Sequence, residues 1–281
     1  MSAPPRTRRR AAARPGVHLL LVVLAVYAMG PMLVLFLSAV KSPAEVSASP
    51  LGWPSEFVWE NFTTAWTDAR MDTGLLNSAV IVLGTVLGVC VISGLAAYAL
   101  VRLDLPKPGV IMLYLLVVTT MPIQLSLVPL LSWWTTLGLY DTQFGLIVIY
   151  WALYSPFATL LLRSYLIAIP PEYEAAARID GAGELRVFVR IVLPLIWPGI
   201  LTAALVAGLQ AYNEFLLAVT FLQDRESLPA SIALFSFQEG YAINYALVSA
   251  AGMIMVAPML LVFLLLQRRF VAGYASTGMA N

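Results

Sequence analysis

The polar side chains that could do chemistry in this chain are few, and they favour binding over catalysis. The sequence holds one histidine, His18, and one cysteine, Cys90, which excludes a histidine-based metal site and an internal disulfide. Its two lysines, Lys41 and Lys107, do not follow a glycine as the phosphate-binding GxxxxGKS/T motif requires. We therefore expect no catalytic residue, no metal and no cofactor, and any nucleotide hydrolysis should occur on another polypeptide.

Three polar residues, Gln210, Asn213 and Glu214, interrupt an otherwise apolar segment. A charged group inside a bilayer is costly unless it is paired or hydrated, and such groups face a cavity or the interior of a helix bundle. We predict that these three residues line a translocation path. The alternative for Glu214 is a buried acid that is hydrogen-bonded to a neighbouring helix.

Aromatic and amide side chains at a similar depth would suit a sugar ligand. A sugar presents apolar CH patches that pack on aromatic faces and hydroxyl groups that bond to amides. Gln124, Tyr150 and Tyr154 have this chemistry, although many packing residues share it. Gln124 is therefore added to the predicted path, and the two tyrosines stay open between ligand contact and packing.

The elements that must position these residues are long apolar helices. Apolar residues make up 60% of the 281 residues, charged residues 11%, and the mean hydropathy is +0.86. A hydrocarbon core of about 30 Å needs roughly 20 apolar residues per helix, and the runs lack the strict alternation of a β-barrel. Six runs are long enough, namely 17–40, 77–100, 110–131, 144–162, 195–222 and 246–266. The predicted fold is an all-α integral membrane protein, with a basic tail over 1–16 and a six-helix domain over 17–281.

The distribution of Arg and Lys predicts the orientation of these helices. With the N-terminus inside, 13 of the 16 basic residues lie on the cytoplasmic side, and only Lys41, Arg70 and Arg225 lie outside. Because cytoplasmic loops carry an excess of Arg and Lys, we expect both termini in the cytoplasm. The basic start also resembles a signal peptide, but the run 17–40 exceeds the apolar region of about 7–15 residues that signals carry, so we expect a retained first helix. Cleavage after the small residues Val46-Ser47-Ala48 is the alternative.

The longest polar interruption on the cytoplasmic side covers residues 170–198. Pro170-Pro171 suits the first turn of a helix. Tyr173, Ala176 and Ala177 then share one face by helical spacing, and a face of alanines lets another surface approach closely. Gly181 can take the positive φ that ends such a helix.

A second short helix is predicted after Gly181, with Asp180 as its N-cap. Its apolar stripe consists of Leu185, Phe188, Val189 and Val192. An amphipathic element this short has little stability alone, so its stripe needs the transmembrane helix ends or a separate subunit as a partner. A helix that lies in the membrane interface is the alternative, which suits the nearby arginines but not the alanine-rich first half.

The loop resembles the EAA loop of permease subunits in binding-protein-dependent ABC importers. That pattern runs Glu-Ala-Ala, three residues, Gly, nine residues, Ile, one residue, Leu-Pro. Here Ala176-Ala177 is followed by three residues, Gly181, nine residues and the segment 191–194 (IVLP). The Glu of the pattern aligns with Ala175, and the acid stands one place earlier, at Glu174. The salt contact of that Glu in relatives is thus absent here, shifted to Glu174, or supplied by a second permease.

The resemblance extends over nearly the whole chain and is nearest to the second permease of maltose-type sugar importers. It rests also on the segments 121–150, 211–222 and 264–281, with Tyr212 where relatives usually have Trp. It implies a permease of a bacterial inner (plasma) membrane that lets a carbohydrate through without being an enzyme itself. The implied partners are a second, different permease, two cytoplasmic ATPase subunits and an external substrate-binding protein, with no role for nucleic acid.

In that family the loop looks like a coupling helix that inserts into a groove of the ATPase. The positions to which this role carries over are Glu174, Ala176, Ala177, Asp180, Gly181 and Phe188. The outside loop 223–245 would, by the same resemblance, reach towards the binding protein.

Other classes stay open at this point. The solute could be a polyol or a glycerol phosphodiester, and a membrane enzyme or a self-contained secondary transporter is the rival class. A secondary transporter should show paired repeats, and the sequence contains no second copy of the 170–200 pattern.

Overall fold

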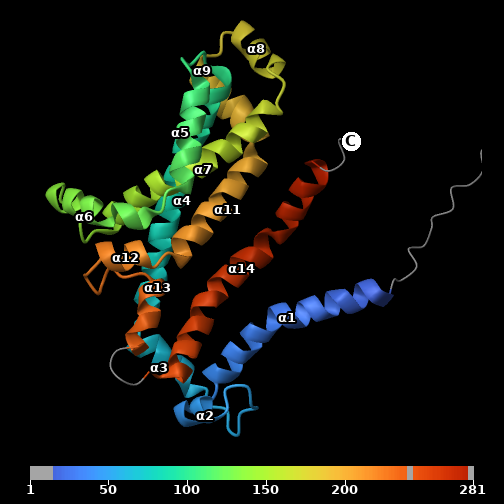
Figure 1. The fold of residues 1–281 in the computed structure, drawn as a ribbon. Helices are drawn as coiled ribbons and strands as arrows, with labels where there is room; N and C mark the ends of the chain where they lie inside the picture. The colour runs from blue at the N-terminus through green and yellow to red at the C-terminus, as the bar shows by residue number, and fades with distance from the viewer. Residues whose placement is uncertain (1–14, 239–242, 278–281) are drawn as a thin grey trace, which may run out of the picture.

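The structure is a computed structural model that describes residues 15–238 and 243–277, and within these ranges every regular element is helical (Figure 1). The long or well-separated α-helices are α1 (Pro15–Ala39), α2 (Pro43–Ala48), α3 (Glu60–Asp68), α4 (Met71–Arg102), α5 (Pro108–Thr120), α6 (Leu127–Thr136), α7 (Gln143–Ile167), α8 (Glu172–Ile179), α11 (Trp197–Asn213), α12 (Leu216–Phe221) and α14 (Tyr245–Thr277). The shorter elements are η1 (Ile123–Ser126), α9 (Glu184–Val187), the π-helical segment η2 (Phe188–Val192), α10 (Leu193–Leu195), α13 (Ala230–Ala233) and η3 (Leu234–Gln238).

Four of the described helices, α1, α4, α7 and α14, are long and apolar enough to cross a membrane. Two bent pairs raise the number to as many as six if each pair counts as one span. In the first pair, α5 meets the segment 123–136 at 92°, and in the second, the segment 184–195 meets α11 at 79°. The predicted all-α membrane fold is therefore confirmed, but two of its spans are not straight.

The apolar run 110–131 does not form one continuous helix. α5 ends at Thr120, and Met121 is extended with a ψ of 128°. The residue after it is Pro122, which has no amide hydrogen and disfavours helical backbone at the residue before it. The run 195–222 is also interrupted, because α11 ends at Asn213 and Glu214 is extended. Hydropathy counts apolar residues and does not register either break.

The centre of the molecule is the packing of α4 against α7 and α11. Two glycines bring α7 close to α4: a Cβ at Gly84 would lie 2.8 Å from Ile147, and one at Gly88 would overlap the ring of Trp151. The Trp151 indole N–H donates to the Gly84 carbonyl at 2.9 Å. Small residues let helix backbones approach in this way, which is how helices associate in lipid.

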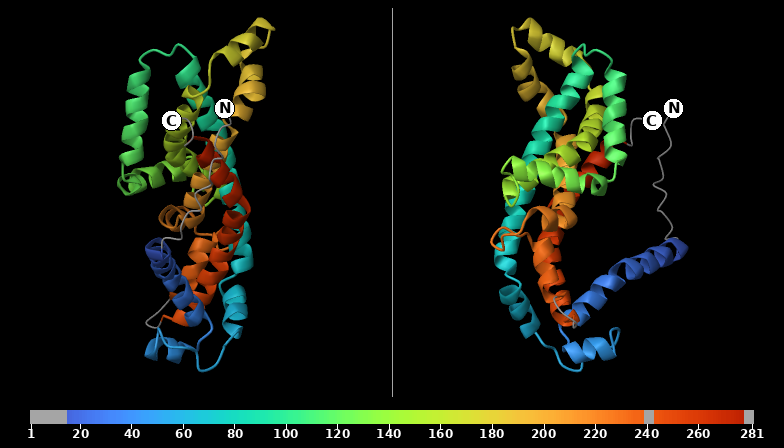
Figure 2. Two further views of the ribbon diagram at one scale, coloured as in Figure 1. Left: turned by 90° about the vertical axis from the view of Figure 1, so that its right-hand side faces the viewer. Right: turned by 60° about the vertical axis from the view of Figure 1, so that its left-hand side comes forward.

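A second group is formed by α14 with α1 and α3. Figure 1 and Figure 2 show that α1 meets α14 near one end of the molecule and then projects away from the other helices. The apolar window of α1 has none of its residues buried. This helix therefore presents an apolar surface that lipid or another subunit must cover.

The two ends of the molecule are built differently. α2 and α3 lie at one end, and α8 and α9 lie at the other (Figure 1). At the first end Lys41 is fully buried, and its ammonium donates to the carbonyls of Ser49, Pro50 and Gly52 at 3.0, 3.3 and 2.6 Å. A buried charge needs such partners, so these bonds fix the chain after α2 to the end of α1.

Candidate functional site

The two-helix shape of the loop 170–198 is set at Gly181. Gly181 has a φ of +82°, as predicted, and its amide donates to the Arg178 carbonyl at 3.0 Å. The amide of Ala182 donates to the Ala177 carbonyl at 3.0 Å, which completes a Schellman ending of α8. A left-handed residue is needed at this position, and glycine adopts that backbone without a Cβ penalty.

The predicted N-cap role of Asp180 is wrong. Asp180 is the C-cap of α8, and the N-cap of α9 is Gly183, which has no side chain to donate or accept. The reason is that the Schellman turn uses the residues after Asp180 before α9 begins at Glu184. Asp180 is exposed in this turn.

Glu174, one place out of register with the family pattern, is the buried residue of α8. Its carboxylate accepts from Arg102 Nε at 2.6 Å and lies 3.4 Å from the Arg178 guanidinium. Arg102 is the last residue of α4, so this ion pair ties α8 to a transmembrane helix. Of the three possibilities raised by the sequence, Glu174 makes a salt contact, and it makes that contact within this chain.

A second set of contacts joins α8 to α9. Arg178 Nε donates to Glu184 Oε1 at 2.7 Å, and Arg178 Nη2 donates to the Tyr98 hydroxyl at 3.1 Å. The Tyr98 hydroxyl in turn donates to Glu184 Oε2 at 2.6 Å. The hydrogen bond to Glu184 raises the pKa of Arg178 further above its ordinary value. The Arg178–Glu184 ion pair therefore joins the two short helices, and the hydrogen bonds of Tyr98 connect both residues to α4.

The predicted apolar stripe of the second helix is wrong in two of its four positions. Phe188 and Val192 are buried as expected, but Leu185 and Val189 are 71% and 48% exposed, and Val187 is buried instead. Val189 lies in the π-helical segment that begins at Phe188, whose wider turn changes how its residues are arranged around the helix axis. Leu185 and Val187 lie before this segment, in α9.

Phe188 packs into the bundle and not outwards. Its ring lies 5.3 Å from that of Tyr98 at an interplanar angle of 62°, and it meets the small surface of Gly94 on α4. Edge contacts between aromatic rings of this kind add to the energy of apolar burial.

The outer surface of α8 remains open at the end of the molecule (Figure 1). Ala175 and Ala176 are exposed, Ala177 is half-buried, and Tyr173 and Ile179 are 58% and 86% exposed. These exposed side chains leave the outer surface of α8 accessible to another protein. The predicted residues thus divide into an outer set around the alanines and an inner pair, Glu174 and Phe188.

A cavity of about 360 Å³ lies among α5, α7 and α11. Its lining is mostly apolar, and its polar members are Thr119, Tyr154, Gln210 and Glu214. Hydroxyl, phenol, amide and carboxylate groups on an apolar wall can bind and orient a polar solute. The sequence pointed to the last three, whereas Thr119 was missed; its signal is a pair of threonines, Thr119 and Thr120, in the middle of the third apolar run.

Glu214 fulfils both of the alternatives that the sequence left open. It lines the cavity, and its carboxylate accepts a hydrogen bond from the Tyr150 hydroxyl on α7 at 2.8 Å. It also accepts from the backbone amides of Leu217 and Ala218 at 2.9 and 3.0 Å, which caps α12. Tyr150 is therefore a packing residue whose hydroxyl holds Glu214, and Tyr154 is the tyrosine that reaches the cavity.

Two predicted path residues do not join this cavity. Gln124 is exposed at the bend between α5 and α6, where its neighbours Met121 and Ile123 line the cavity instead. Asn213 is exposed, and its amide donates to the Leu209 carbonyl at 2.8 Å. The breaks in the third and fifth runs turn both side chains away from the cavity.

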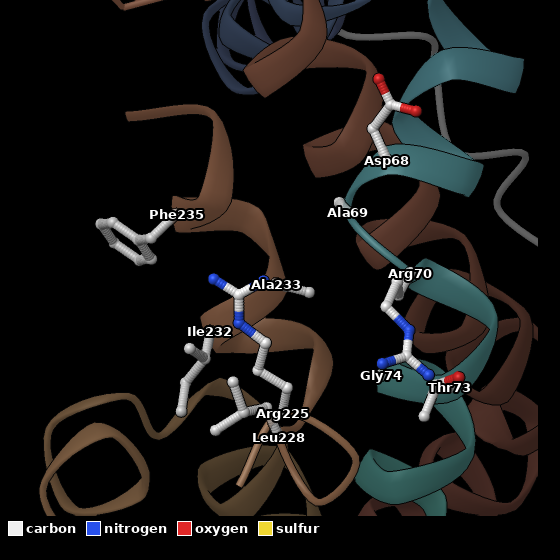
Figure 3. Close-up of a pocket in the computed structure, with 10 residues that line it drawn as sticks. All are labelled: Asp68, Ala69, Arg70, Thr73, Gly74, Arg225, Leu228, Ile232, Ala233 and Phe235. Atoms are coloured by element: carbon white, nitrogen blue, oxygen red, sulfur yellow. The ribbon is translucent and has the colours of Figure 1, made fainter. Parts of the chain in front are cut away.

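The opposite end of the molecule has a recess of about 340 Å³ beside the start of α4 (Figure 3). Arg70 and Arg225 lie on its two sides, and Arg70 pairs with Glu226 at 2.7 Å. Arg225 has no ion-pair partner among the residues that the structure describes. Part of the predicted external loop 223–245, residues 239–242, lies outside the described residues.

Comparisons with known proteins place this chain in a family. Residues 93–275 match the family described as "Binding-protein-dependent transport system inner membrane component". The diacetylchitobiose uptake system permease protein NgcG of Streptomyces coelicolor is 35% identical over 93% of this chain and 87% of its own length. The trehalose transport system permease protein SugB of Mycobacterium tuberculosis is 30% identical over 89% of this chain and 92% of its own length.

Solved structures of similar fold include a bacterial ABC transporter involved in the import of the acidic polysaccharide alginate. One chain of that transporter matches with a TM-score of 0.77 and 21% identity, covering 95% of this chain and 100% of the other. A second match, with a TM-score of 0.66 and 16% identity, comes from the alginate transporter in complex with an alginate pentasaccharide-bound periplasmic protein. Because the identities are this low, these matches establish the fold alone.

Proposed function

Because this chain belongs to the family of binding-protein-dependent transport system inner membrane components, we propose that it is the permease subunit of an ATP-driven carbohydrate importer. The observation that carries this conclusion is the loop 170–198, a two-helix element hinged at Gly181 with an open alanine surface at one end of a membrane bundle. Relatives named for diacetylchitobiose and trehalose support a carbohydrate as the solute.

The cavity forms half of the translocation path in this proposal. Tyr154 supplies an aromatic surface, and Thr119, Gln210 and Glu214 supply hydrogen-bonding groups. A permease with the same fold completes the path from the other side, and the exposed apolar surface of α1 supports such a partner. We infer a second, different permease in this position.

The outer surface of α8 is the contact for a cytoplasmic ATPase subunit, and two such subunits serve the two permeases. Ala176, Ala177, Asp180 and Gly181 form the contact or its turn, while Glu174 and Phe188 act from inside by holding the loop on α4. The opposite end receives the external substrate-binding protein, with both chain termini in the cytoplasm. Coupling between the two ends requires two states of the bundle that differ in their affinity for the binding protein and for the nucleotide-bound ATPase.

Co-purification with candidate ATPase subunits tests this function. We expect Gly181→Pro, which cannot adopt the positive φ, and Ala177→Glu, which places a charge on the contact surface, each to abolish ATPase association. Gly183→Ala is the matched control, because Gly183 has a φ of −72° and open space around it. If ATPase association survives Gly181→Pro and Ala177→Glu at normal expression, the coupling surface lies elsewhere.

A further inference from the structure

Arg102 lies at the meeting point of three elements. Its Nε donates to Glu174 on α8 at 2.6 Å, and its Nη2 donates to the carbonyls of Leu166 and Ile169 at 3.2 and 2.8 Å. Leu166 belongs to the last turn of α7, and Ile169 follows it by three residues. The planar guanidinium can serve a carboxylate and two carbonyls at once, which the single ammonium of lysine does less well.

The Arg102–Glu174 ion pair is buried, so separating it is costly. The Arg102 side chain is 12% exposed and that of Glu174 is fully buried. An exposed ion pair contributes little, but separating a buried pair leaves an uncompensated charge in the interior. Separation is therefore strongly resisted, unlike the weaker pairing of the exposed Arg178 with Glu184.

The same contact leads from the loop to the cavity. α8 has one buried residue, Glu174, and the partner of that residue ends α4 and binds the end of α7. α7 contributes Tyr154 and Phe157 to the cavity wall. A continuous set of packed and bonded groups thus runs from α8 through Arg102 to the lining of the cavity.

We propose that Arg102 is a positioning residue that joins α8 to the cytoplasmic ends of α4 and α7, so that the three elements move as one body when the ATPase displaces α8. The inference rests on the proposed function, because it needs an ATPase that acts on α8. Arg102 touches neither the solute cavity nor the outer surface of α8. Its role is to transmit displacement.

The test measures the distance between α8 and α4 in the assembled importer. Spin labels are placed at Glu172→Cys on α8 and Leu95→Cys on α4, both exposed positions, in a Cys90→Ser background. Distances are recorded by double electron–electron resonance without nucleotide and after trapping with ATP and vanadate. Two variants are compared with this parent. Arg102→Lys keeps the positive charge but lacks the several N–H donors of the guanidinium. The double variant Arg102→Met/Glu174→Met replaces the ion pair by apolar side chains, which a buried site tolerates.

We expect the parent to give the same distance in both states, and both variants to show a longer or broader distance after trapping. Arg190→Lys is the matched control, because Arg190 is exposed in the same loop and makes no side-chain bond in the described structure. Variants that keep the parent distance after trapping overturn the inference. Loss of ATPase co-purification in both variants also overturns it, since the pair would then serve assembly. Failure of the parent itself to bind the ATPase contradicts the proposed function instead.

Discussion

Glu214, in the wall of the cavity, makes two sets of structural hydrogen bonds. Its carboxylate caps α12 and accepts the Tyr150 hydroxyl, while Gln210 one turn earlier lines the same cavity. Gln210 makes no side-chain hydrogen bond in the described part of the chain. The two residues therefore allow solute contact to be separated from support of the fold.

We expect Glu214→Ala to lower both stability and uptake. Loss of the cap costs about 0.5–2 kcal/mol, and the Tyr150 hydroxyl loses its acceptor, so the melting temperature in detergent should fall. Glu214→Gln keeps an acceptor oxygen and should fall less. Gln210→Ala should reduce carbohydrate uptake in reconstituted vesicles with an unchanged melting temperature. Full uptake in assembled Glu214→Gln and Glu214→Ala variants would remove Glu214 from the path.

The second helix of the loop buries one side against α4 and exposes the other. Phe188 faces Tyr98 and Gly94, whereas Leu185 lies on the outside. The position of Leu185, 71% exposed beside the exposed Arg178–Glu184 pair, places it on the side that a partner protein can reach.

Phe188→Ala should therefore lower the stability of the fold, whereas Leu185→Ala should weaken ATPase binding. Phe188→Ala opens a cavity against α4 and should cost about 3–5 kcal/mol. Leu185→Ala removes an exposed side chain and should change the free energy of unfolding by less than about 0.5 kcal/mol, but it should weaken ATPase binding. Thermal unfolding in detergent and a pull-down with the ATPase separate the two effects. Equal destabilisation by both substitutions would contradict the observed burial.

The segment 222–229 contacts the start of α4 through the Arg70–Glu226 ion pair, which responds to pH, and through Asn77, whose amide donates to the carbonyls of Glu226 and Leu228 at 2.7 and 3.0 Å. The hydrogen bond and charge of Arg70 lower the pKa of the Glu226 carboxyl below its ordinary value of 4.5. A lowered folded-state pKa stabilises the attached segment above the unfolded value, and this contribution is lost as the pH falls below 4.5 towards the folded value.

A spin label at Arg225→Cys in a Cys90→Ser background should report this change. We expect its mobility to be low and constant above a pH of about 5 and to rise as the pH is lowered further. Glu226→Gln removes the titrating group but keeps the bonds from Asn77, so it should raise the mobility modestly above a pH of about 5 and remove this pH dependence. If the Arg225→Cys protein and its Glu226→Gln variant give the same pH profile, the Arg70–Glu226 ion pair does not hold this segment.

The whole molecule is asymmetric, with a charge-linked loop at one end and a recess at the other. Thirteen of the 16 Arg and Lys residues fall on the side of the loop if both termini are inside. The exposed positions Asp104, between α4 and α5, and Arg225, beside the recess, lie towards opposite ends of α4. They suit a test of orientation.

We expect a membrane-impermeant maleimide to label Arg225→Cys in intact cells and Asp104→Cys only after the membrane is opened. The Cys90→Ser protein without added cysteine is the control for background labelling. The reverse pattern would place the loop outside and would exclude its contact with a cytoplasmic ATPase.

The membrane helices and the turn at Gly181 could be predicted from the sequence because both depend on residues close together in the chain. A bilayer demands about 20 apolar residues per helix, and a helix that ends in a left-handed residue favours glycine. The all-α membrane fold and the turn at Gly181 therefore follow from residue types and spacing. The assignment of Glu214 to an interior site follows in the same way from the cost of a charge in lipid.

The remaining features depend on which surfaces meet, and only the tertiary structure decided them. The burial of Phe188 beside Tyr98 and Gly94 and the exposure of Leu185 depend on how neighbouring helices pack. The pairing of Glu174 with Arg102 joins residues that are 72 positions apart. The sequence shows both charges, but their attraction depends on distance and on exclusion of water, and folding alone determines these two quantities.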